Sequence, residues 1–175
     1  LRLIETKIVR SLSEAYQHAA TLMKAGHEGT VIKHPKAIWK DGTSKMQVKL
    51  KLEFDCDLVI TGVADGRVGT KNEGRAGAFN VATSDNLLRV DVAIKNEAMR
   101  DVVDADCEAW VGRIVTLIAN DILSPSPSND SYSLFLPRLK EATFRADKTK
   151  ADTLERVQAA MQLAILGKQI VEGTV

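Results

Sequence analysis

Hydrophobic and polar positions follow two different periods along the chain, which predicts both helices and strands. Residues 2–9 mix Leu, Ile, Thr and Val with charges and are expected to form a strand. Apolar residues then recur at helical spacing, with Ser11 and Glu14 placed as a capping box. Gly26 supplies the left-handed residue that ends many helices. The first part of the chain is therefore expected to form a strand followed by a capped helix.

Two further strands are predicted before Asp55, separated by a segment rich in turn residues. Residues 30–32 are Thr, Val and Ile, and Pro35 ends their strand. Residues 46–51 alternate strictly between apolar and polar, which places Lys49 and Lys51 on one face of a strand. A rise of about 3.4 Å per residue sets these lysines about 7 Å apart, a spacing that suits one anionic group.

From Asp55 onward, short apolar runs alternate with turn signals. Asp85 and Asn86 are expected in a tight turn, and residues 96–106 in a helix. A terminal amphipathic helix is expected at residues 149–171. Short strands around one helix are typical of a small Greek-key barrel such as the OB-fold. The five expected strands are residues 57–64, 78–83, 87–92, 112–119 and 133–136.

Composition limits the class of protein without identifying it. The 175 residues, 45% of them apolar, suffice for one large or two small domains. With 24 basic and 23 acidic residues the net charge is +1, so a nucleic-acid surface would have to be a local patch. Cys56 and Cys107 have no partners at metal-ligand spacing, which favours a reducing, cytoplasmic location. No apolar run is long enough to cross a membrane.

Charged groups occur in an order that indicates phosphate chemistry. Glu28 opens a Glu-Gly-x-x-x-Lys motif that ends at Lys33, and the Lys-x-Lys strand follows. An acidic and aliphatic strand runs from Asp55 to Gly62, and the sequence Arg-Ala-Asp-Lys occupies residues 145–148. Each motif alone is more often a solvated surface group. In combination, a carboxylate, two ammonium groups and a guanidinium suit a metal ion, an α-phosphate and a leaving pyrophosphate.

These motifs resemble, in the same order, the last three nucleotide-contacting motifs of ATP-dependent DNA ligases. The match is closest over residues 134–138 and 144–153, which are especially similar to the ligases of T4-type bacteriophages. The resemblance implies a mixed α+β protein in which residues 1–52 are the C-terminal part of an adenylation-domain sheet. Residues 53–148 would form a five-stranded OB-fold domain that binds DNA, and residues 149–175 a C-terminal helix.

The resemblance also implies roles for residues in the first of these regions. Glu28 would help to position Mg²⁺, a hard cation that prefers oxygen ligands. Lys49 and Lys51 would neutralise the α-phosphate of ATP and later the AMP that is transferred. For Lys33, a phosphate contact and a solvated strand lysine are about equally favoured.

A second group of residues would act from the OB domain. Arg145, Asp147 and Lys148 would close over the β- and γ-phosphates of ATP and orient the pyrophosphate for departure. The loop at residues 66–77 carries Arg67, Lys71 and Arg75 among four glycines. Such a loop suits contacts with the DNA backbone, and an ordinary flexible hairpin is an equally good interpretation.

The family's nucleophile, a lysine in the pattern Lys-x-Asp-Gly to which AMP becomes covalently attached, is missing from this sequence. Lys40-Asp41-Gly42 lacks the intervening residue and follows the glutamate motif, so a hairpin loop is expected there. We therefore expect a portion of a longer ligase, inactive alone, with nicked duplex DNA and the rest of the ligase polypeptide as partners. The intact enzyme is expected to be a monomer.

Two other functions fit the same motifs. An mRNA-capping guanylyltransferase or an RNA ligase also uses Glu-Gly and Lys-x-Lys motifs. A short, non-catalytic OB-fold protein that binds nucleic acid is the third possibility. The acidic strand at residues 55–62 and the match around Arg145 favour the DNA ligase.

Overall fold

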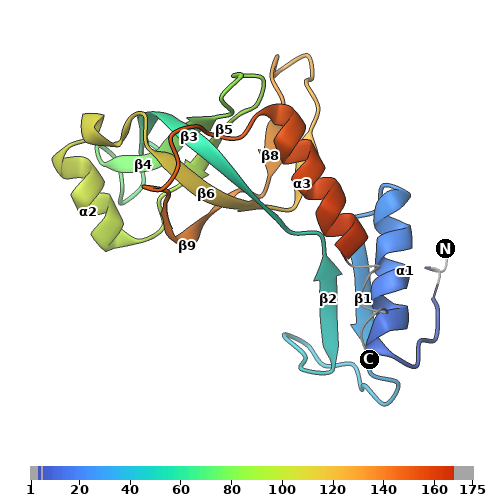
Figure 1. Cartoon of the computed structure of the whole chain (residues 1–175). Coiled ribbons are helices and arrows are strands. Elements are labelled where there is room, and N and C mark those ends of the chain that lie inside the picture. The colour runs from blue at the N-terminus through green and yellow to red at the C-terminus, as the bar shows by residue number, and fades with distance from the viewer. Residues whose placement is uncertain (1–3, 5, 168–175) are drawn as a thin grey trace. The chain divides into compact units, whose positions relative to one another are not determined.

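The computed structural model describes residue 4 and residues 6–167, which belong to two compact units. The first unit contains the chain up to Leu52 and the residues from Gln162 onward, and the second contains Glu53–Met161. Figure 1 shows the order of the helices and strands along the chain. Each unit carries one group of the motif residues.

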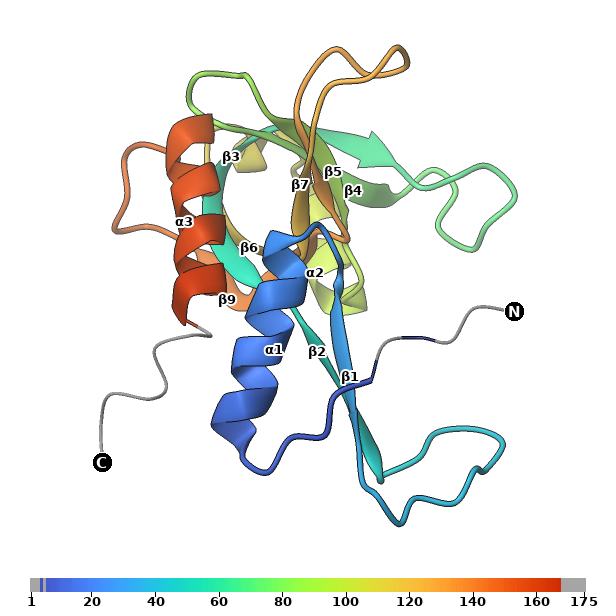
Figure 2. The ribbon, with the colours of Figure 1, turned by 90° about the vertical axis from the view of Figure 1, so that its right-hand side faces the viewer.

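Up to Leu52, the described residues of the first unit form one helix and a two-stranded antiparallel sheet. Its elements are α1 (Leu12–Lys24), β1 (Gly29–Lys33) and β2 (Gln47–Lys51), and α1 contacts both strands (Figure 2). The hydroxyl of Ser11 accepts a hydrogen bond of 3.1 Å from the Glu14 N–H, as predicted. The Glu14 carboxylate accepts from the N–H of Arg10 at 2.7 Å, one residue before the expected cap amide.

The end of α1 also follows the sequence prediction. Gly26 has a φ of 85°, and the N–H of His27 donates to the carbonyl of Leu22 at 3.0 Å. This six-residue closure is the Schellman motif, in which a left-handed residue satisfies the last free carbonyls of the helix. It turns the chain from α1 directly into β1.

The strand predicted at residues 2–9 is wrong for the part that the structure describes. Residues 4 and 6–9 form no strand, and residues 1–3 and 5 lie outside the described residues. Ile4 and Ile8 are 90% and 88% exposed, so neither is held by neighbours. Strand formation depends on pairing and burial more than on the propensity of single residues, and the described residues offer this segment neither.

The sheet of the first unit is a hairpin with a continuous register from Gly29 opposite Lys51 to Lys33 opposite Gln47. Its connecting loop contains Lys40-Asp41-Gly42, which confirms the predicted hairpin loop. Gly29 has a φ of 152°, and a Cβ there would lie 2.0 Å from the carbonyl oxygen of Leu50. Glycine is therefore required at this position if β1 and β2 are to pair.

The second unit is built on a curled, five-stranded antiparallel sheet. The strand order is β5-β4-β3-β6-β9, and a separate two-stranded sheet pairs β7 with β8. This arrangement confirms the predicted mixed α+β class with an OB-like half-barrel. The strands are β3 (Phe54–Asp65), β4 (Ala76–Ala82), β5 (Arg89–Ala93), β6 (Ile114–Ala119), β7 (Asp121–Leu123), β8 (Ser133–Phe135) and β9 (Arg138–Phe144).

The identity of the fifth strand differs from the prediction. The apolar run at residues 133–136 does contain a strand, β8, but this strand pairs with β7 outside the main sheet. The fifth strand is β9, whose sequence Arg-Leu-Lys-Glu-Ala-Thr-Phe has no apolar run and was not predicted. An edge strand pairs along one side only and tolerates charged residues, so its hydrophobic signal is weak.

The core of the second unit lies inside the curled sheet, where the side chains of Leu58, Phe79 and Leu117 are fully buried. Trp110, in the short 3-10 helix η1 (Glu108–Trp110), packs against Phe79 and Phe144 with ring centroids 5.7 and 4.7 Å away. These contacts are aromatic core packing.

Helix α2 (Glu97–Ala105) lies between β5 and β6 in the chain, at the position predicted for residues 96–106. Its cap is Asn96, whose side chain accepts from the Met99 N–H at 3.1 Å. Arg100 is buried and donates to the carbonyls of Ala76 and Ile94, which joins the helix to the ends of β4 and β5.

The last helix, α3 (Leu154–Gly167), begins later than the prediction, which started at residue 149. Residues 149–153 are not helical because the backbone of Asp152 is used elsewhere: its N–H donates to Asp57 and its carbonyl accepts from Ser84. The predicted end at residue 171 lies outside the described residues. Within the described part of the chain, no helix has both the length and the apolar character needed to cross a membrane.

The two cysteines provide a chemical test of the second unit. Cys56 is buried on β3 and Cys107 is exposed. Burial, and then the negative charges of Asp152 and Asp57, raise the pKa of the Cys56 thiol to about 12. We expect an aromatic disulfide reagent at pH 8 to modify Cys107 quickly and Cys56 only after denaturation, because the thiolate is the reactive form. Rapid modification of both thiols in the native protein, measured by absorbance, would contradict this fold.

Candidate functional site

The acidic motif and the lysine motif meet in the first unit. Because Gly29 pairs with Lys51, Glu28 lies at the end of the hairpin, and its Oε1 is 2.5 Å from Nζ of Lys51. The hydrogen bond and charge of Lys51, with a smaller contribution from Lys49, hold the pKa of Glu28 below its usual value. The structure therefore brings Glu28 and Lys51 together at the end of two paired strands.

The other two lysines lie on the same side of this hairpin. Lys49 pairs with Val31 and Lys33 with Gln47, and directly opposed residues point to the same face of a sheet. Lys33, Lys49 and Lys51 thus share a face, with Lys33 and Lys49 exposed. Lys33 is about 14 Å along the strand from Gly29, so it is remote from the Glu28 carboxylate.

At the end of the β1–β2 hairpin, the candidate ligand for a magnesium ion is the carboxylate of Glu28. Among the residues described, no three His, Cys, Asp or Glu side chains come together as a metal-binding group. Mg²⁺ commonly takes one or two protein carboxylates and completes its octahedron with water and phosphate oxygens. Glu28 fits that pattern as a single ligand, provided that its carboxylate exchanges Lys51 for the metal.

The Arg-x-Asp-Lys motif forms a turn immediately after β9. The N–H of Lys148 donates to the carbonyl of Arg145 at 3.1 Å, which closes the turn. Nε and Nη2 of Arg145 donate to the two carboxylate oxygens of Asp147 at 2.8 and 2.7 Å. This bidentate pair lowers the pKa of Asp147 to about 2.

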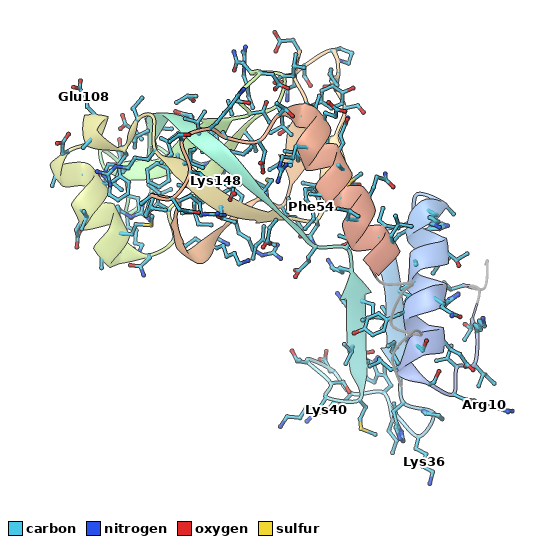
Figure 3. The ribbon with its side chains drawn as sticks, in the orientation of Figure 1. Arg10, Lys36, Lys40, Phe54, Glu108 and Lys148 are labelled. Carbon is cyan, nitrogen blue, oxygen red and sulfur yellow. The ribbon has the colours of Figure 1, made fainter. Side chains whose placement is uncertain are left out.

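Asp57, which sequence reasoning did not single out, joins this turn to the sheet. Its Oδ2 accepts from Nη1 of Arg145 at 2.9 Å and from Nζ of Lys148, and Figure 3 shows Lys148 beside β3. Its Oδ1 accepts from the Thr116 hydroxyl at 2.6 Å. Burial alone would raise the pKa of Asp57, but hydrogen bonds from Lys148 and Thr116, and the charges of Lys148 and Arg145, outweigh it and lower that pKa.

The sequence contains a pattern that could have identified Asp57 as a buried, paired carboxylate. Alternation along β3 places Asp57 on the same face as Asp55, which is exposed, yet Asp57 is only 5% exposed. Arg145 and Lys148 of the turn, and Asp152 just before α3, bind Asp57. A second acidic residue two positions after the first, inside an otherwise apolar strand, is the pattern that could have marked it.

A pocket of about 370 Å³ lies beside this turn in the second unit. Basic residues from β9, the turn and α3 face acidic residues from β3 and the segment before α3. Its charged lining residues are Asp55, Asp57, Asp152, Lys140, Arg145, Lys148 and Arg156. Each of these basic side chains is paired with a carboxylate in the structure.

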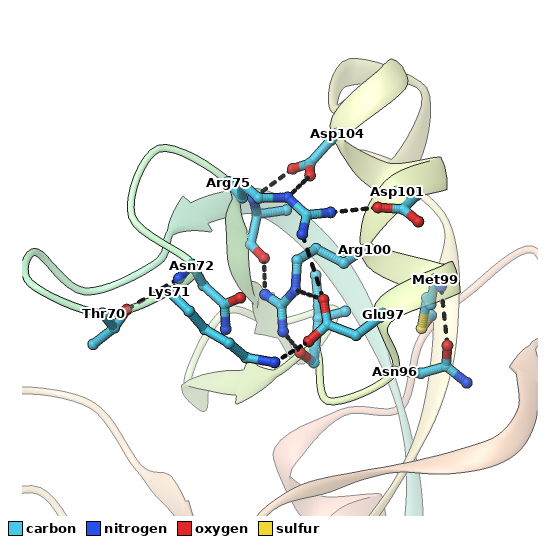
Figure 4. A network of polar contacts seen from close by, with 12 residues as sticks. Thr70, Lys71, Asn72, Arg75, Asn96, Glu97, Met99, Arg100, Asp101 and Asp104 are labelled. Carbon is cyan, nitrogen blue, oxygen red and sulfur yellow. Dashed lines mark hydrogen bonds and ion pairs between the residues drawn. The ribbon is translucent and has the colours of Figure 1, made fainter.

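The loop at residues 66–77 is folded back on α2 (Figure 4). Arg75 donates to Asp104 at 2.9 Å and also pairs with Asp101 and Glu97, while Lys71 binds Glu97 at 2.7 Å. Two of the three predicted DNA-binding cations are therefore already paired with carboxylates.

The remaining cation of this loop, Arg67, is exposed and forms no ion pair with another described residue. The loop itself is closed by the N–H of Gly66, which donates to the carbonyl of Arg75 at 2.7 Å. In the structure, Arg67 is thus the loop cation that can bind a phosphate without first breaking an ion pair with a carboxylate.

The curled sheet and the turn that follows β9 define the class of the protein, an OB-fold domain with an appended helix. Solved structures support this class. The chain matches a structure from an analysis of Lig E DNA ligases with a TM-score of 0.61, at 18% identity, over 78% of this chain and 48% of that one. It matches another, described as "Pmar-Lig_Pre.", with a TM-score of 0.62, at 22% identity, over 76% and 30%. At these identities the likeness shows a shared fold.

Sequence similarity adds relatives that are named DNA ligases. The chain is 34% identical over 99 residues to the DNA ligase of Enterobacteria phage T3, covering 57% of this chain and 28% of the phage protein. It is 32% identical over 89 residues to the DNA ligase of Escherichia phage T7, covering 49% and 25%. "DNA ligase 2" of Methanosarcina mazei is 26% identical over 156 residues, covering 77% and 27%. No protein-family model matches the chain.

The predicted resemblance to DNA ligases is therefore confirmed: the chain is similar to part of these proteins. It spans between 25% and 28% of the length of these relatives. A capping guanylyltransferase, an RNA ligase and a non-catalytic OB-fold protein are not favoured. The narrower likeness to T4-type phage ligases stays a prediction, because these phage relatives come from T3 and T7.

Acid titration tests the buried carboxylate. Because the pKa of Asp57 is lowered in the folded protein, its stabilisation is full above the unfolded value of about 3.9 and is lost as the pH falls through the folded value. We expect Asp57→Asn to cost about 2 kcal/mol at pH 7 and to flatten the fall in stability between about pH 5 and pH 2. Urea unfolding at several pH values measures both effects.

Asp55→Asn is the matched control for this titration, since it removes an exposed partner of Lys140 from the same strand. It should leave the acid dependence largely in place. An equal flattening in both variants would show that Asp57 is not the group responsible.

Proposed function

We propose that this chain is part of an ATP-dependent DNA ligase that seals 5′-phosphate/3′-hydroxyl nicks in duplex DNA. The similarity to the T3 and T7 DNA ligases carries the proposal. The pairing of β1 with β2 supports it, because it brings Glu28 to Lys51 and sets Lys49 on the same face. ATP, Mg²⁺ and nicked DNA are the corresponding ligands, and the bacterial or phage-infected cytosol is the expected location.

The reaction would proceed in three displacements. A lysine amine attacks the α-phosphate of ATP, forming a lysine–AMP bond and releasing pyrophosphate. The 5′-phosphate of the nick then attacks the AMP phosphorus and frees the lysine. Finally the 3′-hydroxyl attacks the 5′-phosphate and AMP leaves. The attacking lysine would lie in another part of the polypeptide, since this sequence has no Lys-x-Asp-Gly.

Lys49 and Lys51 would act on the phosphate at which these first two steps occur. Charge grows on its oxygens in each transition state, and fixed ammonium groups stabilise that charge. Mg²⁺, when bound with ATP, would supply further charge neutralisation, and Glu28 would hold it through one carboxylate. Lys33 is the least supported member because of its distance along β1.

Arg145, Asp147 and Lys148 would act on the β- and γ-phosphates. The guanidinium of Arg145 can bind two oxygens of a phosphate through Nε and Nη2, the edge that Asp147 occupies in the structure. Lys148 adds a second positive charge from the same turn. Their joint effect would be to orient the pyrophosphate in line with the attacking amine.

Substitution of the strand lysines tests this proposal in the ligase polypeptide that contains the chain. Lys49→Ala and Lys51→Ala should each lower nick sealing at least about 100-fold, because each removes transition-state charge stabilisation. Lys45→Ala, at an exposed lysine in the hairpin loop, is the control and should stay close to wild type. Sealing is measured on a labelled nicked duplex. Labelling by GTP in place of ATP, or wild-type activity of both strand variants, would refute the proposal.

The basic loop gives a second test, on DNA affinity. We propose that Arg67 contacts the DNA backbone directly, so Arg67→Ala should weaken binding to nicked duplex about fivefold and reduce the salt slope by about one. Arg75→Ala should mainly lower the Tm by several degrees, because three acidic side chains of α2 lose their shared cation. Fluorescence anisotropy at several salt concentrations measures the affinity. The reverse ranking would assign DNA contact to Arg75.

A further inference from the structure

Asp57 is a buried carboxylate that the motif comparison does not assign and that the three displacement steps do not use. It lies on β3 of the second unit, about 90 positions before the Arg-x-Asp-Lys turn, and is 5% exposed. An ionised carboxylate at such a depth is tolerated only with compensating hydrogen bonds and charge. Asp57 obtains both from the two cations that the proposed function places on the leaving pyrophosphate.

Arg145 and Lys148 both bind the same oxygen atom of Asp57. Oδ2 of Asp57 accepts from Nη1 of Arg145 at 2.9 Å and from Nζ of Lys148. Two donors within hydrogen-bonding distance of the same oxygen lie at most about 6 Å from each other. Oxygen atoms of neighbouring phosphate groups lie within this limit. Oδ1 is fixed independently by the hydroxyl of Thr116 at 2.6 Å, so the carboxylate has little freedom to rotate.

Asp57 is also fixed through its backbone. Its N–H donates to Oδ2 of Asp152 at 2.8 Å, and its carbonyl accepts from the N–H of Asp152 at 2.8 Å. The N–H of Arg145 donates to the carbonyl of Ile114 on β6 at 2.9 Å. The chain is therefore attached to β6 at Arg145 and to β3 at Asp152, on either side of the turn, and the side chain of Asp57 binds the turn between these points.

The two carboxylates that bind Arg145 differ in exposure. Asp147 covers the Nε and Nη2 edge and its side chain is 65% exposed, whereas the side chain of Asp57 holds Nη1 and is 7% exposed. A phosphate can displace an exposed carboxylate at small cost, because water solvates the displaced group. The buried carboxylate of Asp57 would not be solvated by water if a phosphate displaced it. The structure thus separates an exchangeable partner from a permanent one.

We infer that Asp57 is a positioning residue that holds Arg145 and Lys148 as a pair, oriented for the β- and γ-phosphates of ATP. The inference rests on the proposed function. Its action is confined to the step in which pyrophosphate leaves, since the later two steps involve no β- or γ-phosphate. Loss of the carboxylate should therefore slow lysine adenylation and spare the sealing of DNA that already carries AMP.

The experiment compares these two reactions in the ligase polypeptide that contains this chain. Asp57→Asn keeps the size of the side chain and the bond from Thr116 while it removes the charge. At saturating ATP and Mg²⁺ we expect its single-turnover rate of lysine–AMP formation to fall at least about tenfold. Its rate of sealing a nick that is adenylated in advance should stay within about twofold of wild type. Asp57→Glu should recover part of the adenylation rate.

Two control variants separate positioning from folding. Asp55→Asn removes the partner of Lys140 in the same pocket and should leave both rates within about twofold. Thr116→Val keeps the Asp57 charge but frees the carboxylate to rotate, and should slow adenylation about threefold with sealing unchanged. This second variant tests the inference even if Asp57→Asn is too unstable to assay.

Each outcome is decisive. A selective loss of adenylation supports the inference. Equal loss of both rates, with a lowered Tm, would reduce Asp57 to a structural residue and overturn it, as would unchanged adenylation in Asp57→Asn and Thr116→Val. Failure of the wild-type polypeptide to form lysine–AMP and to seal an adenylated nick would instead refute the proposed function, and the inference with it.

Discussion

A charge buried in a small domain must find its partners in the same domain, and in the second unit this requirement is met by Asp57, Arg145 and Lys148. The ion pairs tie the segment after β9 to β3. They hold the Arg-x-Asp-Lys turn against the sheet, and the hydrogen bonds of the Asp57 backbone with the side chain and N–H of Asp152 fix where α3 begins. The position of the turn thus depends on the carboxylate of Asp57, and the start of the last helix on the backbone groups of the same residue.

The first unit depends on a simpler constraint, the register of β1 and β2. Gly29 lies so close to the carbonyl of Leu50 that no larger residue fits there, and this pairing sets Glu28 beside Lys51. In both units, then, a candidate phosphate-binding cation is held by a carboxylate. Opposite charges at each site keep the cations oriented, and an exposed carboxylate can be exchanged for a phosphate or a metal ion.

Much of the local structure could be predicted from the sequence. The cap at Ser11, the stop at Gly26 and the strict alternation around Lys49 each follow from interactions within a few residues, and each is present. Two predictions about strands failed: a strand was expected at residues 2–9, and strand β9 was missed. Whether such segments become strands depends on a partner edge far away in the sequence, which local propensity does not describe.

The sequence by itself determined the order of the motifs, the kinship with DNA ligases and the helices and strands with strong periodicity, because these depend on residue types and short spacings. Tertiary structure decided which cations are already paired. It placed Lys71 and Arg75 against the acidic face of α2, left Arg67 exposed, and joined Asp57 to residues 88 and 91 positions further along the chain. Long-range ion pairs of this kind form only when folding brings distant strands and turns together, so a linear pattern cannot specify them.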